Sequence, residues 1–460
     1  MTTLERVTVP ESVLADFYPE VTVAELEARL QPAVDAMGED ALDHIVVYAD
    51  REHSANHEYL CGMAPRFEES LLILGRDGRR SVVLGNECQN YTPDPALNIE
   101  VMLFQDFSPP GQQRDKPLHI RELLKRAGID KRHRVGVLGS KALTAGFVDG
   151  PRHALDIPSY VADALRDVVG DPLLAINVTD LMIDPEQGLR LSNTAADIAR
   201  AEYAASVTSA SVRSAILNLR VGVSERELER FLVPRGLPLT CHSMISFGEK
   251  VRRGLSSPSD RTASVGAPFV VAFGVQGALS CRAGMVAAGP SEVAADTRDF
   301  YADFSKNYFD VVATWYESVQ VGVTSGAVFD AAERVREPAL FSFLLPPGHF
   351  LSIEEWVQSS FHRNSTTVLK SGSLLQSDVI PVSGGPFVYN NLEDGIALAD
   401  KKLQDELRRD FPDLMMRADT RRAFLCDVLG IQIDQSVIPL SNAPGWLAPY
   451  VLEPDLAYVR

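Results

Sequence analysis

Two histidines and one cysteine are the side chains best suited to chemistry in this sequence. They are His242, in the segment HSMISFG, His349, in GHFLSIEEW, and Cys281, which Arg282 follows. A histidine changes its charge near neutral pH, so either one could transfer a proton as a general acid or base. A cation beside a cysteine favours the reactive thiolate. Neighbouring strand residues point to opposite faces, however, so a small buried cysteine is the plainer interpretation of Cys281.

Two glutamates and a tryptophan follow His349 closely. Glu354 and Glu355 are adjacent, so one of them could project into a pocket and bind a substrate amine or guanidinium while the other stays in solvent. Trp356 could form a wall of that pocket or fill the core. Either histidine could equally be a hydrogen-bonded structural residue, so the residue types leave a catalytic and a structural interpretation open.

Several short motifs that indicate a known chemistry are absent from the sequence. The stretch GVQGALSCRAG lacks both the lysine of a phosphate-binding loop and the spacing of a dinucleotide-binding loop. The sequence contains no GxSxG nucleophile elbow, no HExxH zinc motif and no CxxC pair. Local motifs therefore give no support to those classes of enzyme or binding protein.

The composition is that of a globular protein. The chain has 460 residues, of which 45% are hydrophobic and 23% are charged, and this length favours two domains over a single core. The 44 lysines and arginines stand against 62 aspartates and glutamates, which gives a net charge of −18. Such a charge repels phosphate backbones, so we expect no nucleic-acid partner.

Cysteine usage and the lack of long apolar runs indicate a compartment. The five cysteines are odd in number and form no close pairs, which favours a reducing environment over a disulfide framework. The N-terminal stretch MTTLERVTVPESVLADF carries acidic residues and does not resemble a signal peptide. Nowhere do 18 uncharged apolar residues run together. We therefore expect a cytoplasmic protein without a membrane partner.

The elements that must position these side chains fall into two groups. The first 185 or so residues alternate between strand-like and helix-like segments, which predicts an α/β domain with a mixed sheet. The expected helices cover 23–37, 117–128 and 159–169; the expected strands cover 44–49, 134–139 and 174–178, with a hairpin over 70–85.

The character of the chain changes at residues 185–188. A long helix is predicted from residue 192, because apolar residues recur at steps of three, four and seven and Thr194 with Asp197 forms an N-terminal cap. Strands follow, with a hairpin over 268–285 and helices over 299–319 and 325–335. We therefore expect three parts: an N-terminal domain over 1–188, a second domain over 189–400, and a tail over 401–460 that packs on the second domain or on a partner subunit.

The hairpin over 268–285 carries a family resemblance. Its sequence, PFVVAFGVQGALSCRAGM, resembles the hairpin that holds the first two metal-binding aspartates in the creatinase/aminopeptidase P (pita-bread) family. In that family an Asp-Phe-Gly triplet begins the turn and a Ser-Asp pair lies on the returning strand. Here the triplet is Ala272-Phe273-Gly274 and the pair is Ser280-Cys281, so both carboxylates are missing.

Later motifs of the family are better kept. The Gly-His motif, whose histidine is a metal ligand in the metallopeptidases, is similar to Gly348-His349. The segment LKSGSLLQSDVIP places Asp378 where the family has a glutamate, and NLEDG places Glu393 at the last bridging carboxylate. Leu255 and Ser256 stand where a substrate-contacting histidine is expected.

The resemblance implies a pita-bread domain preceded by a creatinase-like α/β domain. YLCG followed by Arg66-Phe67-Glu68 resembles a segment of that N-terminal domain. Because these enzymes form dimers, we expect a homodimer in which Arg66 could reach the pocket of the neighbouring subunit. A surface salt bridge is the plainer role for Arg66.

The surviving polar residues limit how many metal ions can bind. A dinuclear site needs bridging carboxylates to neutralise about four positive charges. His349, Asp378 and Glu393 could still hold one divalent ion as a facial triad, with water completing its shell. They could equally form a metal-free pocket, as in creatinase, which hydrolyses a C–N bond with a histidine as its acid or base. We expect the metal-free arrangement and no cofactor.

Three functions follow from the resemblance. The leading hypothesis is a metal-independent hydrolase of a C–N bond in a small amino-acid-like, guanidino or amide compound. His349 would transfer the proton, while Asp378, Glu393 and one of the glutamates 354 and 355 would hold a cationic group. The further substrate contacts expected are Cys281, Arg282, His242, Trp356 and Arg66. The alternatives are a non-catalytic binding or scaffold protein and a mononuclear Xaa-Pro metallopeptidase.

Overall fold

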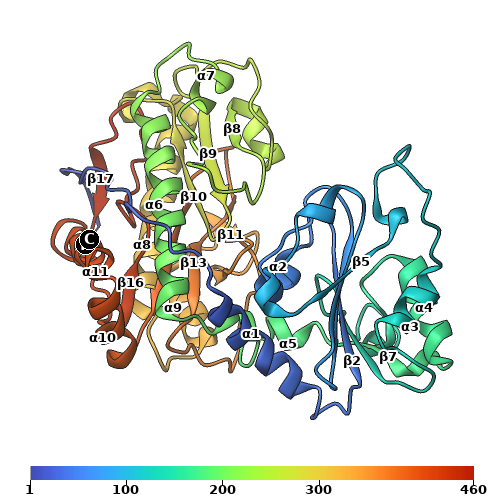
Figure 1. Ribbon diagram of the computed structural model, residues 1–460. Helices are drawn as coiled ribbons and strands as arrows, with labels where there is room; N and C mark the ends of the chain where they lie inside the picture. The colour runs from blue at the N-terminus through green and yellow to red at the C-terminus, as the bar shows by residue number, and fades with distance from the viewer. Residues whose placement is uncertain (1) are drawn as a thin grey trace. The chain divides into compact units, whose positions relative to one another are not determined.

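The computed structural model describes residues 2–460 (Figure 1). The contacts within the chain divide it into two compact units. One unit is Glu20–Arg190, and the other joins Leu191–Arg460 to the N-terminal residues up to Pro19. The division differs from the expected boundary at residue 188 chiefly because the first residues of the chain pack with the last ones. In the described part of the chain, no helix is both long and apolar enough to cross a bilayer.

The Glu20–Arg190 unit is an α/β layer structure with a six-stranded mixed sheet in the order β5-β4-β3-β2-β6-β7. Its strands β2, β6 and β7 run parallel to one another, while β3 lies antiparallel to both β2 and β4. The central strands β2 and β3 are buried along their whole length, as expected for strands covered on both faces. The strands are β2 (His44–Ala49), β3 (Ser70–Gly75), β4 (Arg80–Leu84), β5 (Glu100–Leu103), β6 (Val135–Leu138) and β7 (Ala175–Asn177). The helices are α1 (Val23–Ala36), α2 (Ala55–Cys61), α3 (Ile120–Arg126), α4 (Ser159–Val169) and α5 (Asp180–Ile183).

The second unit is built around a larger antiparallel sheet in the order β12-β13-β15-β10-β9-β8, with β16 paired to β15. Long helices cover it: α6 packs along β9, β10 and β15 (Figure 1). The predicted cap of α6 is present, since Thr194 and Asp197 exchange hydrogen bonds between side chain and backbone. The strands are β8 (Met244–Phe247), β9 (Pro268–Val275), β10 (Ala278–Met285), β12 (His349–Phe350), β13 (Leu374–Asp378), β15 (Leu392–Leu398) and β16 (Val437–Pro439). The helices are α6 (Ala195–Leu217), α7 (Glu225–Glu229), α8 (Ala295–Ser318) and α9 (Ser325–Val335), and β11 (Phe341–Phe343) pairs with β14 (Pro381–Ser383).

The tail after residue 400 packs on this same unit. Its helices α10 (Lys401–Asp410) and α11 (Pro412–Ala423) are followed by a π-helical turn at Phe424–Val428 and by β16. The buried carboxylate of Glu202 on α6 pairs with Arg417 and Arg421 of α11. The last strand, β17 (Leu456–Val459), pairs with β1 (Thr3–Arg6) near the start of the chain. This pairing joins the first residues to the second unit, together with contacts such as the hydrogen bond from Ala15 N to Ser206 Oγ.

Candidate active site

One row across the larger sheet joins residues from five strands. The register places Met244 opposite Ala272, Ala272 opposite Cys281, Cys281 opposite Glu393, and Glu393 opposite Asp378. Residues directly opposite each other in an antiparallel sheet share one face, with their Cβ atoms about 5 Å apart. The sheet thus brings two carboxylates and an apolar half-row together from segments that are distant in the sequence.

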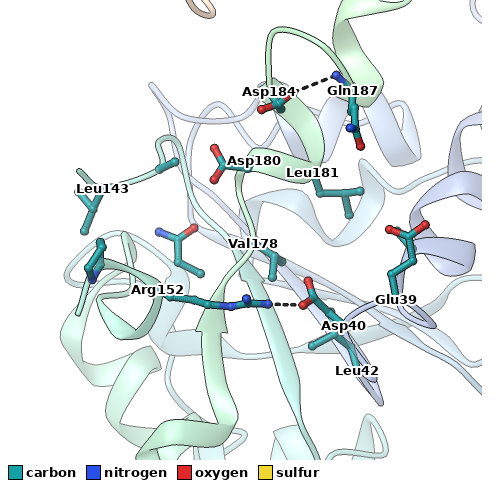
Figure 2. Close-up of a pocket in the computed structure, with 14 residues that line it drawn as sticks. Glu39, Asp40, Leu42, Leu143, Arg152, Val178, Asp180, Leu181, Asp184 and Gln187 are labelled. Carbon is teal, nitrogen blue, oxygen red and sulfur yellow. Dashed lines mark hydrogen bonds and ion pairs between the residues drawn. The ribbon is translucent and has the colours of Figure 1, made fainter. Parts of the chain in front are cut away.

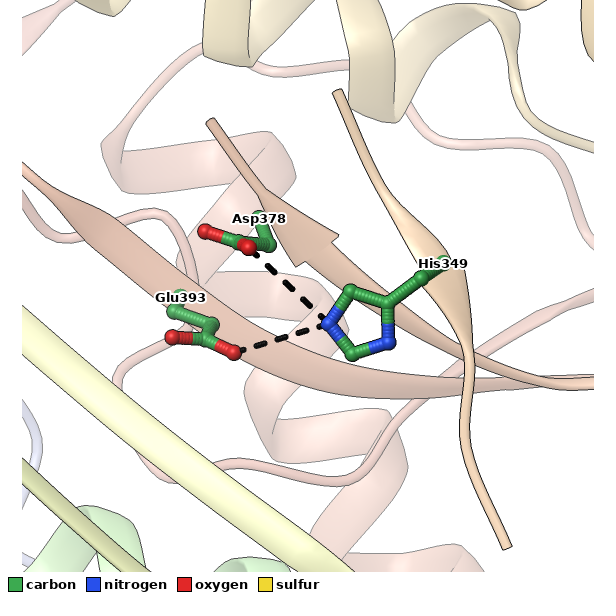
Figure 3. Close-up of side chains that lie close together, drawn as sticks. All are labelled: His349, Asp378 and Glu393. Atoms are coloured by element: carbon green, nitrogen blue, oxygen red, sulfur yellow. Dashed lines mark ion pairs between the residues drawn. The ribbon is translucent and has the colours of Figure 1, made fainter. Parts of the chain in front are cut away.

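His349 joins the acidic end of this row from the edge strand β12. It pairs with Gln376, which lies two residues before Asp378 and so on the same face of β13. The imidazole is fully buried and stacks on the indole of Trp356, with ring centroids 4.2 Å apart and planes 29° from parallel. Figure 3 shows the ring directed between Asp378 and Glu393.

The hydrogen bonds of His349 define the free nitrogen of its ring. Nδ1 lies 3.1 Å from the carbonyl oxygen of Phe350, and because a carbonyl can only accept, Nδ1 carries the hydrogen and donates it. In the neutral ring Nε2 therefore holds the lone pair. Nε2 has no hydrogen-bond partner among residues 2–460. A buried imidazole nitrogen without a partner is unusual and indicates a ligand or a catalytic role.

Three carboxylates surround Nε2 without closing on it. The distances from Nε2 are 3.7 Å to Glu393 Oε1, 3.8 Å to Glu355 Oε2 and 3.9 Å to Asp378 Oδ2. All three exceed the length of a hydrogen bond. The side chains of Asp378 and Glu393 are only 5% and 8% exposed, whereas that of Glu355 is 31% exposed. The cluster of His349, Glu355, Asp378 and Glu393, called the acidic cluster below, therefore leaves room for an atom between its members.

Burial and mutual repulsion raise the pKa values of the three carboxyl groups of this cluster. Burial raises the pKa of Asp378 well above its usual value, and the negative charge of Glu393 raises it further. Burial and the charge of Glu355 do the same to the pKa of Glu393. Burial also raises the pKa of Glu355, against the opposing effect of His349. Three such carboxylates cannot all be ionised in a dry site unless a cation neutralises them.

Two amide side chains that the sequence analysis missed add further acceptors. Gln376 donates through Nε2 to the carbonyl oxygen of Leu279, and its Oε1 has no partner in the described chain. Asn391 hydrogen-bonds Tyr389, whose pKa is raised first by burial and then by Cys281, Asp378 and Glu393. Oδ1 of Asn391 and Oδ1 of Asp378 also lack partners within residues 2–460. These oxygens and Nε2 of His349 are acceptors when the carboxylates are ionised, so the site suits a ligand that supplies donors or positive charge. Each amide stands two residues before a carboxylate, a strand spacing that could have identified both.

The other half of the row is apolar. Ala272, Leu279 and Cys281 form a buried hydrophobic cluster, against which the half-buried Cys241, Met244 and Val270 pack. We call these six residues the apolar floor. Burial raises the pKa of the Cys281 thiol well above its usual value, and Glu393 raises it further. Cys281 is therefore a neutral thiol at physiological pH rather than an activated nucleophile.

Neither the acidic cluster nor the apolar floor includes Arg282, His242 or Arg66, three of the contacts expected from the sequence. Arg282 points to the opposite face of β10, where its Nη2 lies 2.9 Å from both carboxylate oxygens of Asp394. His242 is exposed and lies with Nε2 2.7 Å from the carbonyl oxygen of Leu255. Arg66 is an exposed side chain of the Glu20–Arg190 unit. Arg282 does lower the pKa of the Cys281 thiol, but burial raises that pKa by more, so the neighbouring cation does not produce a thiolate.

The two adjacent glutamates have different surroundings. Glu355 faces Nε2 of His349, as the distance above shows. Glu354 is half-buried, and its charge contributes to raising the pKa of Glu355. Glu355 is thus the member of the pair that belongs to the acidic cluster.

The residues present fit one metal ion but not two. One ligand atom each from His349, Asp378 and Glu393 lies within 4.8 Å of the others, and the lone pair of Nε2 is unused. This donor set suits a single divalent ion completed by water. At positions 272 and 281 the site offers a methyl group and a neutral thiol inside the apolar floor. Neither side chain carries a carboxylate that could bridge to a second ion.

A separate pocket lies in the Glu20–Arg190 unit (Figure 2). It has a volume of about 530 Å³ and is lined by the acidic side chains of Glu39, Asp40, Asp180 and Asp184. Arg152 pairs with Asp40 at its edge. Burial and the charge of Asp184 raise the pKa of Asp180. None of the residues expected from the sequence to form the active site lines this pocket.

Comparison with known proteins identifies the fold. No model of a protein family and no curated protein matches the sequence. Among solved structures, the dipeptidase PepE from Mycobacterium ulcerans is similar with a TM-score of 0.61 and 18% identity, over 83% of this chain and 95% of that one. The Xaa-Pro dipeptidase from Bacillus anthracis is similar with a TM-score of 0.59 and 17% identity, over 82% of this chain and 96% of that one. The X-Pro aminopeptidase from Thermotoga maritima is similar with a TM-score of 0.59 and 14% identity, over 81% of this chain and 95% of that one.

These likenesses are ones of fold. The chain has the two-domain α/β architecture of these peptidases, with the pita-bread fold in its second unit. The expected fold class is thereby confirmed.

Proposed function

We propose that this protein is a hydrolase of a C–N bond in a small amino-acid-like compound and that it works without a metal ion. The observation that carries the proposal is Nε2 of His349, an unpaired buried nitrogen among three carboxylates. The fold, found in dipeptidases, supports the peptidase-type reaction class.

His349 has the features of a general base. Its Nδ1–H is held by the Phe350 carbonyl, and Trp356 fixes the plane of the ring, so Nε2 keeps one direction. Nε2 would take a proton from water as the water oxygen bonds to the carbon of the C–N bond. The C–N bond then breaks, and the same nitrogen returns the proton to the leaving amine. The carboxylates of Glu355 and Glu393 would stabilise the imidazolium formed between these steps.

The acidic cluster would bind the positive group of the substrate. An ammonium or guanidinium supplies several N–H donors, and the unpaired acceptors on Gln376, Asp378 and Asn391 can receive them. The positive charge would also allow Asp378 and Glu393 to ionise despite their burial. A substrate without a positive group would leave this charge uncompensated, so the proposal predicts cationic substrates.

A second candidate is a hydrolase that uses one divalent ion, favoured by the compact donor set of His349, Asp378 and Glu393. When bound there, the ion would act as a Lewis acid and lower the pKa of a coordinated water. Nε2 of His349 would then be a ligand and would no longer be available as a base. Glu355, which lies beside the three ligands, would be the remaining carboxylate able to accept a proton.

The experiment is a screen of small amidines, lactams, ureas and Xaa-Pro dipeptides with chelator-treated protein, repeated with His349→Ala. The proposal predicts turnover of a cationic member of the panel and its loss in the variant. His362→Ala is the matched control, because His362 is exposed and is not one of the residues expected to form the site. Turnover that His349→Ala leaves unchanged contradicts the assignment. Ligand binding without turnover of any panel member favours the non-catalytic binding protein instead.

A further inference from the structure

The apolar floor lies directly beside the acidic cluster, and this juxtaposition has a consequence for specificity. We propose that the substrate carries an apolar group next to its positive group and that Ala272, Cys281 and Met244 form the surface that receives the apolar group. This inference rests on the proposed function for the cationic half of the ligand. It adds the chemical class of the other half, a short aliphatic or aromatic group.

The sheet register sets the distance between the two halves. Cys281 is the direct neighbour of Glu393, Ala272 is one strand further, and Met244 is one strand beyond that. Adjacent strands lie about 4.8 Å apart, so the floor starts about 5 Å from the Glu393 backbone and extends for about another 10 Å. This span is as long as a leucine or phenylalanine side chain.

The residues of the floor are small or deformable. Ala272 and Cys281 have short side chains, and their two positions carry no charge to repel an apolar group. Met244 and Cys241 are only half-buried, so part of their surface stays accessible beside the row. Methionine adapts its shape to the groups packed against it. A carboxylate at 272 or 281 would place a charge where the apolar group is proposed to bind.

Binding of a homologous series of primary amines tests the inference on the full-length, chelator-treated protein. We expect isothermal titration calorimetry of methylamine to hexylamine to show affinity that rises about three- to four-fold per methylene until the floor is covered. An affinity that stays flat along the series overturns the proposal.

Substitutions on the floor separate its effect from that of the acidic cluster. Met244→Gln, at a half-buried position, should weaken pentylamine binding about tenfold and leave methylamine binding unchanged, and Cys281→Ser should act in the same direction. Val382→Ser, at an exposed apolar position on β14, is the control and should change neither. Thermal melting first verifies that Met244→Gln and Cys281→Ser are folded. If these variants weaken the binding of methylamine and of pentylamine equally, the floor does not bind the apolar group.

The result can be told apart from a failure of the proposed function. Binding that depends on chain length, without hydrolysis of any compound, would support the proposed role of the floor and contradict the proposed hydrolase activity. Hydrolysis of cationic substrates at rates that do not depend on the apolar group would support the hydrolase activity and contradict the proposed role of the floor.

Discussion

Cys281 on β10 lies directly opposite Glu393 on β15. This pair is the boundary of the site, with the acidic cluster on the Glu393 side and the apolar floor on the Cys281 side. The buried thiol of Cys281 belongs to a hydrophobic cluster, so on its side of the pair the row offers an apolar surface. The chemistry of the site therefore changes within one strand spacing of about 4.8 Å.

Replacing Glu393 by Gln should stabilise the protein while it removes function. The amide keeps the shape of the carboxylate but removes one of the mutually repelling buried charges, so we expect the free energy of unfolding to rise by about 1–2 kcal/mol. Binding of cationic ligands should weaken at least tenfold. Urea unfolding measures the first effect and calorimetry the second. Glu11→Gln, at an exposed position, is the control; a Glu393→Gln protein that is less stable than wild type contradicts the electrostatic account.

Trp356 should act as a positioning residue for His349. Its indole stacks on the imidazole at 4.2 Å, so Trp356→Leu should free the ring to rotate away from the substrate. We expect kcat to fall about tenfold with little change in KM. Trp356→Phe, which keeps an aromatic face, should restore most of kcat. An equal loss in both variants, or a loss confined to KM, would show that the stacking does not position the base.

Breaking the ion pair of Arg282 should damage stability but not chemistry. Arg282 and Asp394 are both buried on the face of the sheet away from the acidic cluster, and Arg282→Met leaves Asp394 as an uncompensated charge. The expected loss is about 3–5 kcal/mol in the free energy of unfolding. The double variant Arg282→Met/Asp394→Leu should recover part of it. Activity per folded molecule should stay at the wild-type level in both variants. A loss of kcat without a loss of folded protein would show that Arg282 takes part in catalysis.

Acid should destabilise the Glu20–Arg190 unit through His57. Burial lowers the pKa of this fully buried imidazole to about 4, against about 6.5 in an unfolded chain. Between these values the unfolded state binds the proton and the folded state does not. Stability is therefore fully present above pH 6.5 and is lost as the pH falls towards 4, by about 3 kcal/mol for this one group.

His57→Gln tests this pH dependence. Glutamine can keep hydrogen bonds to Met63 and Ser70, the partners of the two ring nitrogens, without titrating. Urea unfolding at pH 7 and at pH 4 should show a smaller difference in this variant than in wild type. His53→Gln, at an exposed histidine, serves as the matched control. An unchanged difference in His57→Gln would mean that other groups cause the acid sensitivity.

The sequence predicts the local elements well. The hairpin expected over 268–285 is present as β9 and β10, because two apolar runs flank a turn in which Gly277 adopts a φ of +91°. The cap of α6 is similarly local. The candidate residues His349, Asp378 and Glu393 come from motifs, and the structure brings them together.

The sequence does not reveal what depends on strand register. Nothing local shows that Cys281 faces Glu393, since more than a hundred residues separate the two strands. The same holds for the pairing of β1 with β17, which joins the two ends of the chain. The role of Arg282 also depends on a distant partner, Asp394. Long-range pairing of this kind is set by the packing of the whole domain rather than by neighbouring residues.

The most direct test of the account is the turnover of a cationic C–N substrate by protein that has been freed of metal with a chelator and checked by elemental analysis. The account predicts that the metal-free protein keeps its full rate and that His349→Ala abolishes it. A rate that disappears with the chelator and returns with one equivalent of a divalent ion would contradict it.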